Sequence, residues 1–152
     1  MRITSDCPLL DPGLVDSVVR AGRDQQADYS CNFLPARRFP RGLDCEALTR
    51  TTLERLDRLA RQARFREHVT LYLYDPQGAA ADGETFQVAS VSASQDTSTF
   101  RWTVDTPEDL ALVRRIYQEL GSRSFDWTDV LELCRAHPAW TELNQAIVQK
   151  VA

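Results

Sequence analysis

The sequence has few of the residues that hold metals or build disulfide frameworks. Its 152 residues include four cysteines and two histidines. No two cysteines are spaced as C-x-x-C, and neither His68 nor His137 completes a metal-ligand pattern with them. This spacing argues against a zinc site. We therefore expect reduced thiols in a cytoplasmic protein, because disulfides are rare in the cytosol.

Long apolar runs and a basic surface are also absent. No run is long enough to span a bilayer, and the first residues lack the apolar core of a secretory signal. The net charge is −4, which does not suit a nucleic-acid-binding surface. We expect neither a membrane nor a nucleic-acid partner. With 43% hydrophobic and 26% charged residues, the composition is that of one folded domain, residues 1–152.

Strand-like and helical segments alternate along the chain, which predicts an α/β fold with parallel strands and crossover helices. Asp11-Pro12 and Thr106-Pro107 each combine a capping side chain with a proline in the first helical turn. We expect strands at residues 1–4, 29–32, 42–48, 85–93 and 97–104. We expect helices at residues 12–21, 50–65, 67–74, 107–120, 127–136 and 140–151.

Two aspartates, Asp6 and Asp105, each follow a strand-like run and precede a proline-opened helix. In open α/β sheets, ligands bind outside the carboxyl ends of the strands. Two carboxylates brought there from distant parts of the sequence suit one magnesium ion, which takes oxygen ligands from protein, water and phosphates. The alternative is local: Asp6 closes a turn, and Asp105 assists the helix start at Thr106.

Four segments, in order along the chain, resemble the cytidylyltransferase family of spore-coat polysaccharide biosynthesis and acylneuraminate cytidylyltransferase-like proteins. Residues 2–12, R-I-T-S-D-C-P-L-L-D-P, resemble its strand–turn–helix motif. Residues 39–46 resemble its F-P-x-G-L-D-x-E segment, and residues 66–70 its R-E-H-V-T. Residues 101–109 resemble its R-W-T-V-D-T-P-E-D. Each motif alone is weak, but the set is specific.

The resemblance implies a nucleotide-diphospho-sugar transferase fold, with a mixed sheet flanked by helices. It implies that a sugar hydroxyl attacks the α-phosphate of CTP, giving a CMP-sugar and pyrophosphate for surface polysaccharide or glycan synthesis. It assigns Mg²⁺ to Asp6 and Asp105. The metal would offset charge on the leaving pyrophosphate.

Further site residues are expected from the same matched segments. Asp44 and Glu46 alternate with apolar neighbours, so both point to one face, where they would meet sugar hydroxyls or only solvent. Arg41, with Arg37 and Arg38, lies on a basic loop suited to a sugar carboxylate or phosphate. The remaining candidates are Glu67 for substrate binding, His68 as a ligand-orienting or acid–base group, and Arg101 for a phosphate.

The family's phosphate-cradling loop, Q-A-R-x-x-S-x-R-L-P-G-K, does not occur in these residues. The fold is therefore expected to be partial, lacking the first strands, and the chain alone to be inactive or incomplete. It would be a truncated product, half of a split enzyme that needs a complementary N-terminal chain, or a non-catalytic remnant or interaction module. An exposed strand edge would favour homo-oligomers. A glycosyltransferase is a further alternative, but its usual D-x-D motif is absent.

Overall fold

A small mixed sheet lies at the centre of the computed structural model, which describes residues 1–149. Its central strand is β1 (Tyr29–Cys31). On one side β1 pairs antiparallel with β2 (Glu46–Leu48), and on the other parallel with β3 (Val88–Ser90). The expected α/β class with a mixed sheet is confirmed.

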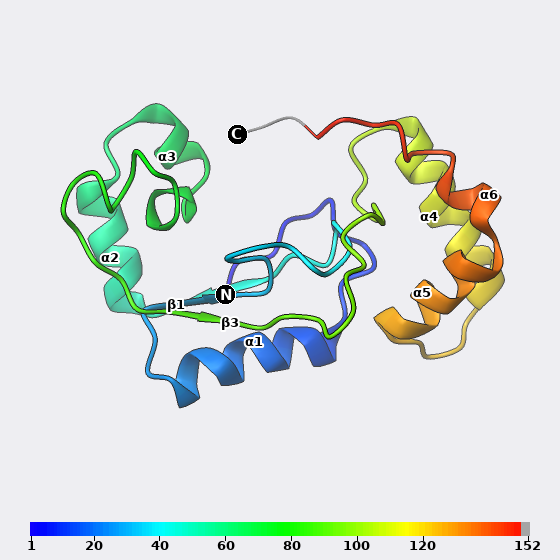
Figure 1. The fold of residues 1–152 in the computed structure, drawn as a ribbon, viewed down its shortest axis with the longest axis horizontal. Helices are drawn as coiled ribbons and strands as arrows, with labels where there is room; N and C mark the ends of the chain where they lie inside the picture. Colours follow the sequence, from blue (N-terminus) through cyan, green and yellow to red (C-terminus); the bar gives the residue numbers. More distant parts are fainter. Residues whose placement is uncertain (150–152) are drawn as a thin grey trace.

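Helix α1 (Pro12–Asp24) covers one face of this sheet and contacts all three strands (Figure 1). Its apolar stripe places Val18 against the sheet, where the Ser30 hydroxyl donates to the Val18 carbonyl at 2.9 Å. Asp11 caps the helix by accepting from the Leu14 amide at 2.7 Å, and Pro12 occupies the first turn. This start agrees with the prediction from Asp11-Pro12.

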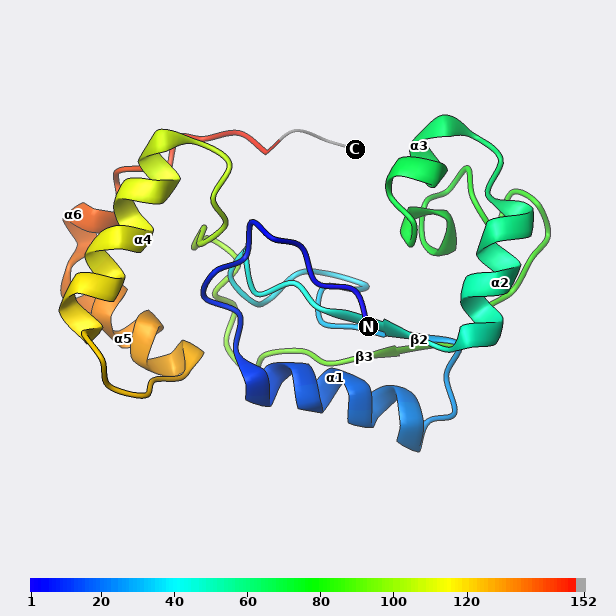
Figure 2. The same cartoon turned by 180° about the vertical axis from the view of Figure 1, so that it is seen from behind.

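Two groups of helices lie at opposite ends of the sheet (Figures 1 and 2). One end carries α2 (Arg50–Leu59), α3 (Ala63–Glu67) and the 3₁₀ turn η1 (Leu71–Leu73). The other end carries α4 (Pro107–Leu120), α5 (Trp127–Ala136) and α6 (Pro138–Thr141). No helix among the described residues is long and apolar enough to cross a membrane.

Two hydrophobic clusters match this arrangement. The main cluster joins α1, α4 and α5 around the fully buried side chains of Leu43, Trp102 and Ile116. The second lies among α2, α3 and η1, where the Phe65 and Tyr72 rings meet edge to face at 5.4 Å. All four cysteines are free and buried.

The strands are much shorter than the sequence patterns predict. The strands expected at 1–4 and 97–104 are reduced to single bridges, Arg2 with Glu46 and Arg41 with Arg101. Only Val88–Ser90 of the strand expected at 85–93 pairs, and only Glu46–Leu48 of that at 42–48. Alternation of apolar residues reports which side chains are buried, and here irregular segments bury them as well as strands would.

Two expected helices also differ. The helix expected at 50–65 breaks after Leu59, since Ala60 leaves the helical conformation with a ψ of 88°. The break lets α3 turn back, so that Phe65 packs in the cluster with Leu56. The helix expected at 67–74 is a 3₁₀ turn, and after α6 the described part of the segment expected at 140–151 forms turns and irregular backbone. The rest of that segment lies outside the described residues.

Candidate functional site

Two loop segments pass closely beside each other next to the sheet. The Arg41 amide donates to the Phe100 carbonyl at 3.0 Å, and the Trp102 amide donates to the Arg41 carbonyl at 2.7 Å. Gly42, with φ of +100°, comes so near that a Cβ atom there would lie 2.5 Å from the Thr103 amide nitrogen. This crossing holds the Arg41 loop beside the segment that leads to Asp105.

Asp6 lies beside the same segment, further along it. Its carbonyl accepts from the Val104 amide at 2.8 Å, and its Oδ2 accepts from the Thr103 hydroxyl at 2.9 Å. Burial raises the pKa of Asp6, but hydrogen bonds from Thr4 and Thr103 outweigh burial and leave it below its usual value. The fold thus brings an ionised Asp6 next to the residue that precedes Asp105.

The Asp105 carboxylate lies against Arg101. Its Oδ2 accepts from Arg101 Nη2 at 2.6 Å, although the Asp105 side chain remains 42% exposed. Arg101 also forms a two-pronged pair with the fully buried Asp109, through Nε at 2.9 Å and Nη2 at 3.0 Å. Gln149 Oε1 takes a further hydrogen bond from Nη1 at 2.5 Å. These contacts hold the Arg101 guanidinium inside the protein. The phosphate contact expected for Arg101 stays a prediction.

A pocket of about 290 Å³ opens beside Arg41. It is lined by Arg2, Thr4, Phe33, Arg37, Arg41, Asp44, Glu46 and Tyr74. Asp44 and Glu46 therefore do share one side of the chain. Both Asp44 oxygens accept from Arg37, one of them at 2.8 Å. The buried Glu46 accepts from Arg2 through Oε1 and from the Tyr29 hydroxyl, at 2.5 Å, through Oε2.

Arg41 connects this pocket to the aspartates. Burial and the neighbouring charge of Arg37 lower the pKa of Arg41, while the charges of Asp44 and Asp105 act in the opposite direction. The charges of both acids therefore act on the Arg41 guanidinium. Among the described residues, no hydrogen bond or ion pair is formed by the Arg41 guanidinium.

Glu67 and His68 do not line this pocket. They lie at the end of α3, where Glu67 is exposed and the His68 amide donates to the Arg64 carbonyl at 2.9 Å. Tyr74, which sequence reasoning missed, does reach the pocket from beyond η1. No sequence signal marked Tyr74, because its place depends on tertiary packing. The Tyr74 ring stacks near the Tyr29 ring, and their centroids are 6.4 Å apart.

The donors near Asp6 and Asp105 fit magnesium better than zinc. Residues 1–149 contain no group of three or more His, Cys, Asp or Glu side chains placed to hold a metal. Magnesium needs only one or two carboxylates, with water and phosphate oxygens completing its shell. Arg101 engages one oxygen of Asp105 and leaves the other for a cation. Asp6 accepts from the Thr103 hydroxyl through Oδ2 and from the Cys7 thiol, at 3.8 Å, through Oδ1, and a cation there would replace the weak thiol contact.

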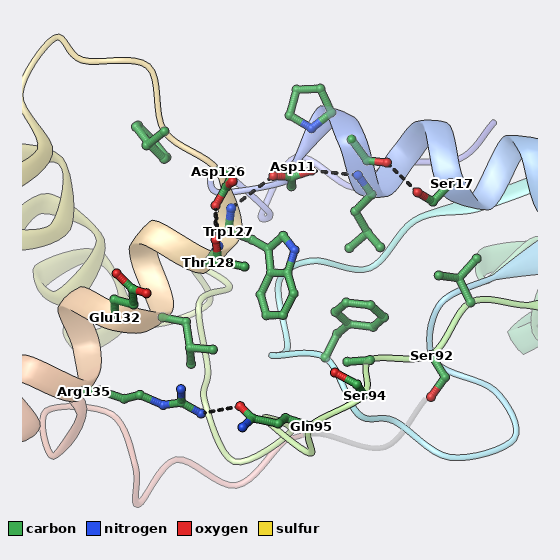
Figure 3. A pocket seen from close by; sticks show the side chains of 18 of the residues that line it. Asp11, Ser17, Ser92, Ser94, Gln95, Asp126, Trp127, Thr128, Glu132 and Arg135 are labelled. Carbon is green, nitrogen blue, oxygen red and sulfur yellow. Dashed lines mark hydrogen bonds between the residues drawn. The ribbon is translucent and has the colours of Figure 1, made fainter.

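A larger cleft of about 850 Å³ lies between the starts of α1 and α5 and the loop after β3 (Figure 3). Asp11 joins the two helices there: its Oδ1 caps α1, and its Oδ2 accepts from the Trp127 amide at 3.0 Å. The Trp127 ring packs edge to face against the Phe39 ring, with the ring centroids 5.3 Å apart. None of the site residues expected from the sequence lines this cleft.

Comparisons with known proteins identify relatives of the chain in sequence. The chain is 31% identical to the spore coat polysaccharide biosynthesis protein SpsF of Bacillus subtilis over 126 residues, which are 81% of the chain and 48% of SpsF. It is 25% identical to the uncharacterized protein MJ1063 of Methanocaldococcus jannaschii, over 99% of the chain and 58% of that protein. No family model matches the chain.

A solved structure agrees with these relatives. The structure of a cytidylyltransferase from Leptospira borgpetersenii aligns with a TM-score of 0.84 and 29% identity, over 97% of the chain and 60% of that protein. The chain spans about half the length of the curated relatives it matches, 48% of one and 58% of the other. The chain is thus similar in sequence to a spore coat polysaccharide biosynthesis protein, and in sequence and fold to a cytidylyltransferase.

Proposed function

We propose that the chain provides the metal and acceptor side of a cytidylyltransferase, which transfers CMP from CTP to a sugar or sugar acid for surface polysaccharide or glycan synthesis. The observation that carries this proposal is the meeting of Asp6 with the Asp105 segment through the Val104 amide, beside the Arg41 pocket. The relatives are a polysaccharide biosynthesis protein and a cytidylyltransferase, which supports this reaction class.

Asp6 and Asp105 would hold Mg²⁺ in this reaction. Bound there, the ion would supply charge stabilisation to the phosphate oxygens. Thr103 fixes the Asp6 carboxylate by its hydrogen bond of 2.9 Å, and Arg101 fixes that of Asp105 at 2.6 Å. Such pre-set orientation matters because positioned carboxylates need no reorganisation when the ligand arrives. The pocket lined by Arg41, Asp44 and Tyr74 would hold the acceptor.

Metal binding gives a direct test. We expect Mn²⁺, used as a paramagnetic substitute for Mg²⁺, to bind the chain and to broaden the amide NMR signals around Asp6 and Asp105. The variants Asp6→Asn and Asp105→Asn should each weaken binding by roughly 10-fold or more, because each removes a charged ligand. Asp57→Asn, at an exposed position on α2, is the matched control. Equal affinity in all four proteins would refute the metal site.

Turnover is a separate question. Because the 152 residues contain no phosphate-cradling loop of the Q-A-R-x-x-S-x-R-L-P-G-K kind, we expect binding of metal without pyrophosphate release from CTP. Substitutions at the positions that align with Asp6 and Asp105 in the cytidylyltransferase from Leptospira borgpetersenii should abolish its CTP turnover if these positions hold the metal. Unchanged turnover there would remove the assignment.

A non-catalytic binding module is the second candidate. The observation that favours it is that the Asp44 carboxylate is already paired with Arg37, and the Asp105 carboxylate with Arg101. In that role, these ion pairs would be structural, and no divalent cation would bind near Asp6. Failure of Mn²⁺ to broaden the signals around Asp6 and Asp105 would favour this candidate.

A further inference from the structure

The carboxylates of the pocket beside Arg41 are engaged by neighbouring donors, whereas the Arg41 guanidinium has no acceptor among residues 1–149. Arg37 takes both oxygens of Asp44, while Arg2 and Tyr29 take those of Glu46. These carboxylates therefore have little capacity left for the sugar hydroxyls expected to meet them. The donors left for a ligand are those outside these pairs, among them the Arg41 guanidinium.

Arg41 is the strongest of these donors. Its side chain is half-buried in the pocket, and none of residues 1–149 accepts a hydrogen bond from its guanidinium. A guanidinium offers five N–H donors in a fixed fork, which matches the two oxygens of a carboxylate or phosphate. Leaving such a group half-buried without an acceptor is costly, and a bound anion would remove that cost.

The surroundings of Arg41 also favour an anion. Three arginines, Arg2, Arg37 and Arg41, line the pocket with two acids, so the pocket carries one excess positive charge. Burial, and then the charge of Glu46, raises the pKa of the Tyr74 hydroxyl to about 12, so that hydroxyl stays protonated and can donate. A neutral sugar would leave the excess charge unmatched.

We propose that Arg41 forms an anion subsite that selects an acceptor sugar carrying a carboxylate or a phosphate group. The identity of the ligand as the acceptor sugar rests on the proposed function, whereas anion binding at Arg41 does not. The pocket volume of about 290 Å³ suits one monosaccharide better than a whole nucleotide. Arg37 would stay on Asp44 and hold the rim of the subsite.

Nitrogen-15 NMR titrations of the chain test the subsite, with inorganic phosphate and glycolate as probes and glycerol as the neutral control. We expect saturable shifts of the Arg41 Nε–H signal and of the amides of residues 41–46. In Arg41→Gln the affinity should fall by roughly 10-fold or more, because the charged fork is lost. Arg41→Lys keeps the charge without the fork and should lie between the two.

The matched control is Arg20→Gln, which removes the same charge from the exposed face of α1. Anion affinity there should equal that of the parent chain. Shifts that are scattered over the surface, or equal affinity in Arg41→Gln and Arg20→Gln, would overturn the subsite.

Three further ligands identify the source of the anion. Glucuronate or glucose 1-phosphate that displaces the probe from Arg41, where glucose does not, supports an acidic acceptor and tells carboxylate from phosphate. If instead CTP displaces the probe and Arg41→Gln weakens CTP binding, Arg41 serves the nucleotide and the acidic-acceptor proposal is wrong. Loss of Mn²⁺ binding at Asp6 would refute the proposed function but would leave the Arg41 shifts unchanged.

Discussion

Asp109 is the residue on which the geometry around Asp105 depends. It is fully buried and accepts from Arg101, from Asn144 at 2.8 Å, and from the Asp105 and Thr106 amides at 3.0 and 3.1 Å. One carboxylate thus closes the cap of α4, pairs with Arg101 and ties down the backbone of the proposed metal ligand. Its role is positioning, since it lies behind the site.

Replacing Asp109 should therefore be costly. In Asp109→Asn the Arg101 charge stays buried without its full partner, and breaking such a pair costs about 3–5 kcal/mol. We expect a loss of about 3 kcal/mol or more in the free energy of unfolding, measured by urea denaturation. Glu108→Gln, one residue earlier and exposed, should cost less than about 0.5 kcal/mol. Equal losses in the two variants would contradict the buried-pair account.

The same carboxylate should make stability depend on pH. Hydrogen bonds from Arg101 and Asn144 outweigh burial and hold the pKa of Asp109 below 3.8, and the pKa of Asp6 is also lowered. A pKa that is lower in the folded state stabilises the protein above the unfolded value of 3.8. This stability should be lost as the pH falls through the folded-state values. Denaturation between about pH 6 and pH 3 should show a decline that is shallower in Asp109→Asn.

Sequence reasoning at the residue scale found the right neighbourhood but not the partners. The structure places Asp6 beside the segment that leads to Asp105, and Asp44 and Glu46 in one pocket, although the strands expected to end at the two aspartates are only single bridges. That Arg37 would occupy Asp44, and that Arg101 would turn inward to Asp109, depends on tertiary packing. No spacing along the chain encodes those pairs.

At the scale of elements, Gly42 controls how the Arg41 loop crosses the segment before Asp105. A Cβ atom there would meet the Trp102 carbonyl carbon and the Thr103 nitrogen, both at 2.5 Å, and φ is +100°. Gly83 has a similar positive φ of +71°, but a Cβ atom there would meet nothing within 4 Å. Comparing Gly42 with Gly83 therefore separates the cost of backbone strain from the cost of steric overlap.

Gly42→Ala should therefore destabilise the protein more than Gly83→Ala. Strain alone at Gly83 should cost about 1 kcal/mol. Strain plus overlap at Gly42 should cost about 3 kcal/mol or more and should shift the amide signals of residues 101–105. Circular dichroism during thermal unfolding, with NMR spectra of both variants, measures these effects. Equal stability of the two variants would show that the loop relaxes away from Trp102.

Helices were predicted better than strands, and the reason is physical. Caps such as Asp11, Thr106 and Asp126 act within a few residues, and each accepts from a backbone amide at the start of its helix. A strand needs a partner from elsewhere in the chain. The segment 97–104 forms a single β-bridge, from Arg101 to Arg41, so its alternating pattern gave a buried but irregular path.

At the scale of the whole molecule, the helices are distributed unevenly around the sheet. Helix α1 covers one face, and the other helices gather in two groups at the ends of the sheet (Figure 2). The site lies between these groups, where loops from both ends of the described chain meet: Asp6 near its start and the Arg101 segment near its C-terminal helices. Within residues 1–149, the sheet has only three strands, and β2 and β3 are its edges.

An open edge strand that carries an exposed apolar side chain favours self-association. Val88 on the edge strand β3 is 40% exposed. We therefore expect the isolated chain to form oligomers at micromolar concentration in sedimentation velocity. Val88→Lys should shift the distribution toward monomer, because a charged edge resists strand pairing.

The control is Leu53→Lys, at a 47% exposed position on α2, which should leave the oligomers unchanged. A monodisperse parent chain that unfolds cooperatively as a monomer would refute this expectation. Equal dissociation by both substitutions would instead place the contact away from β3.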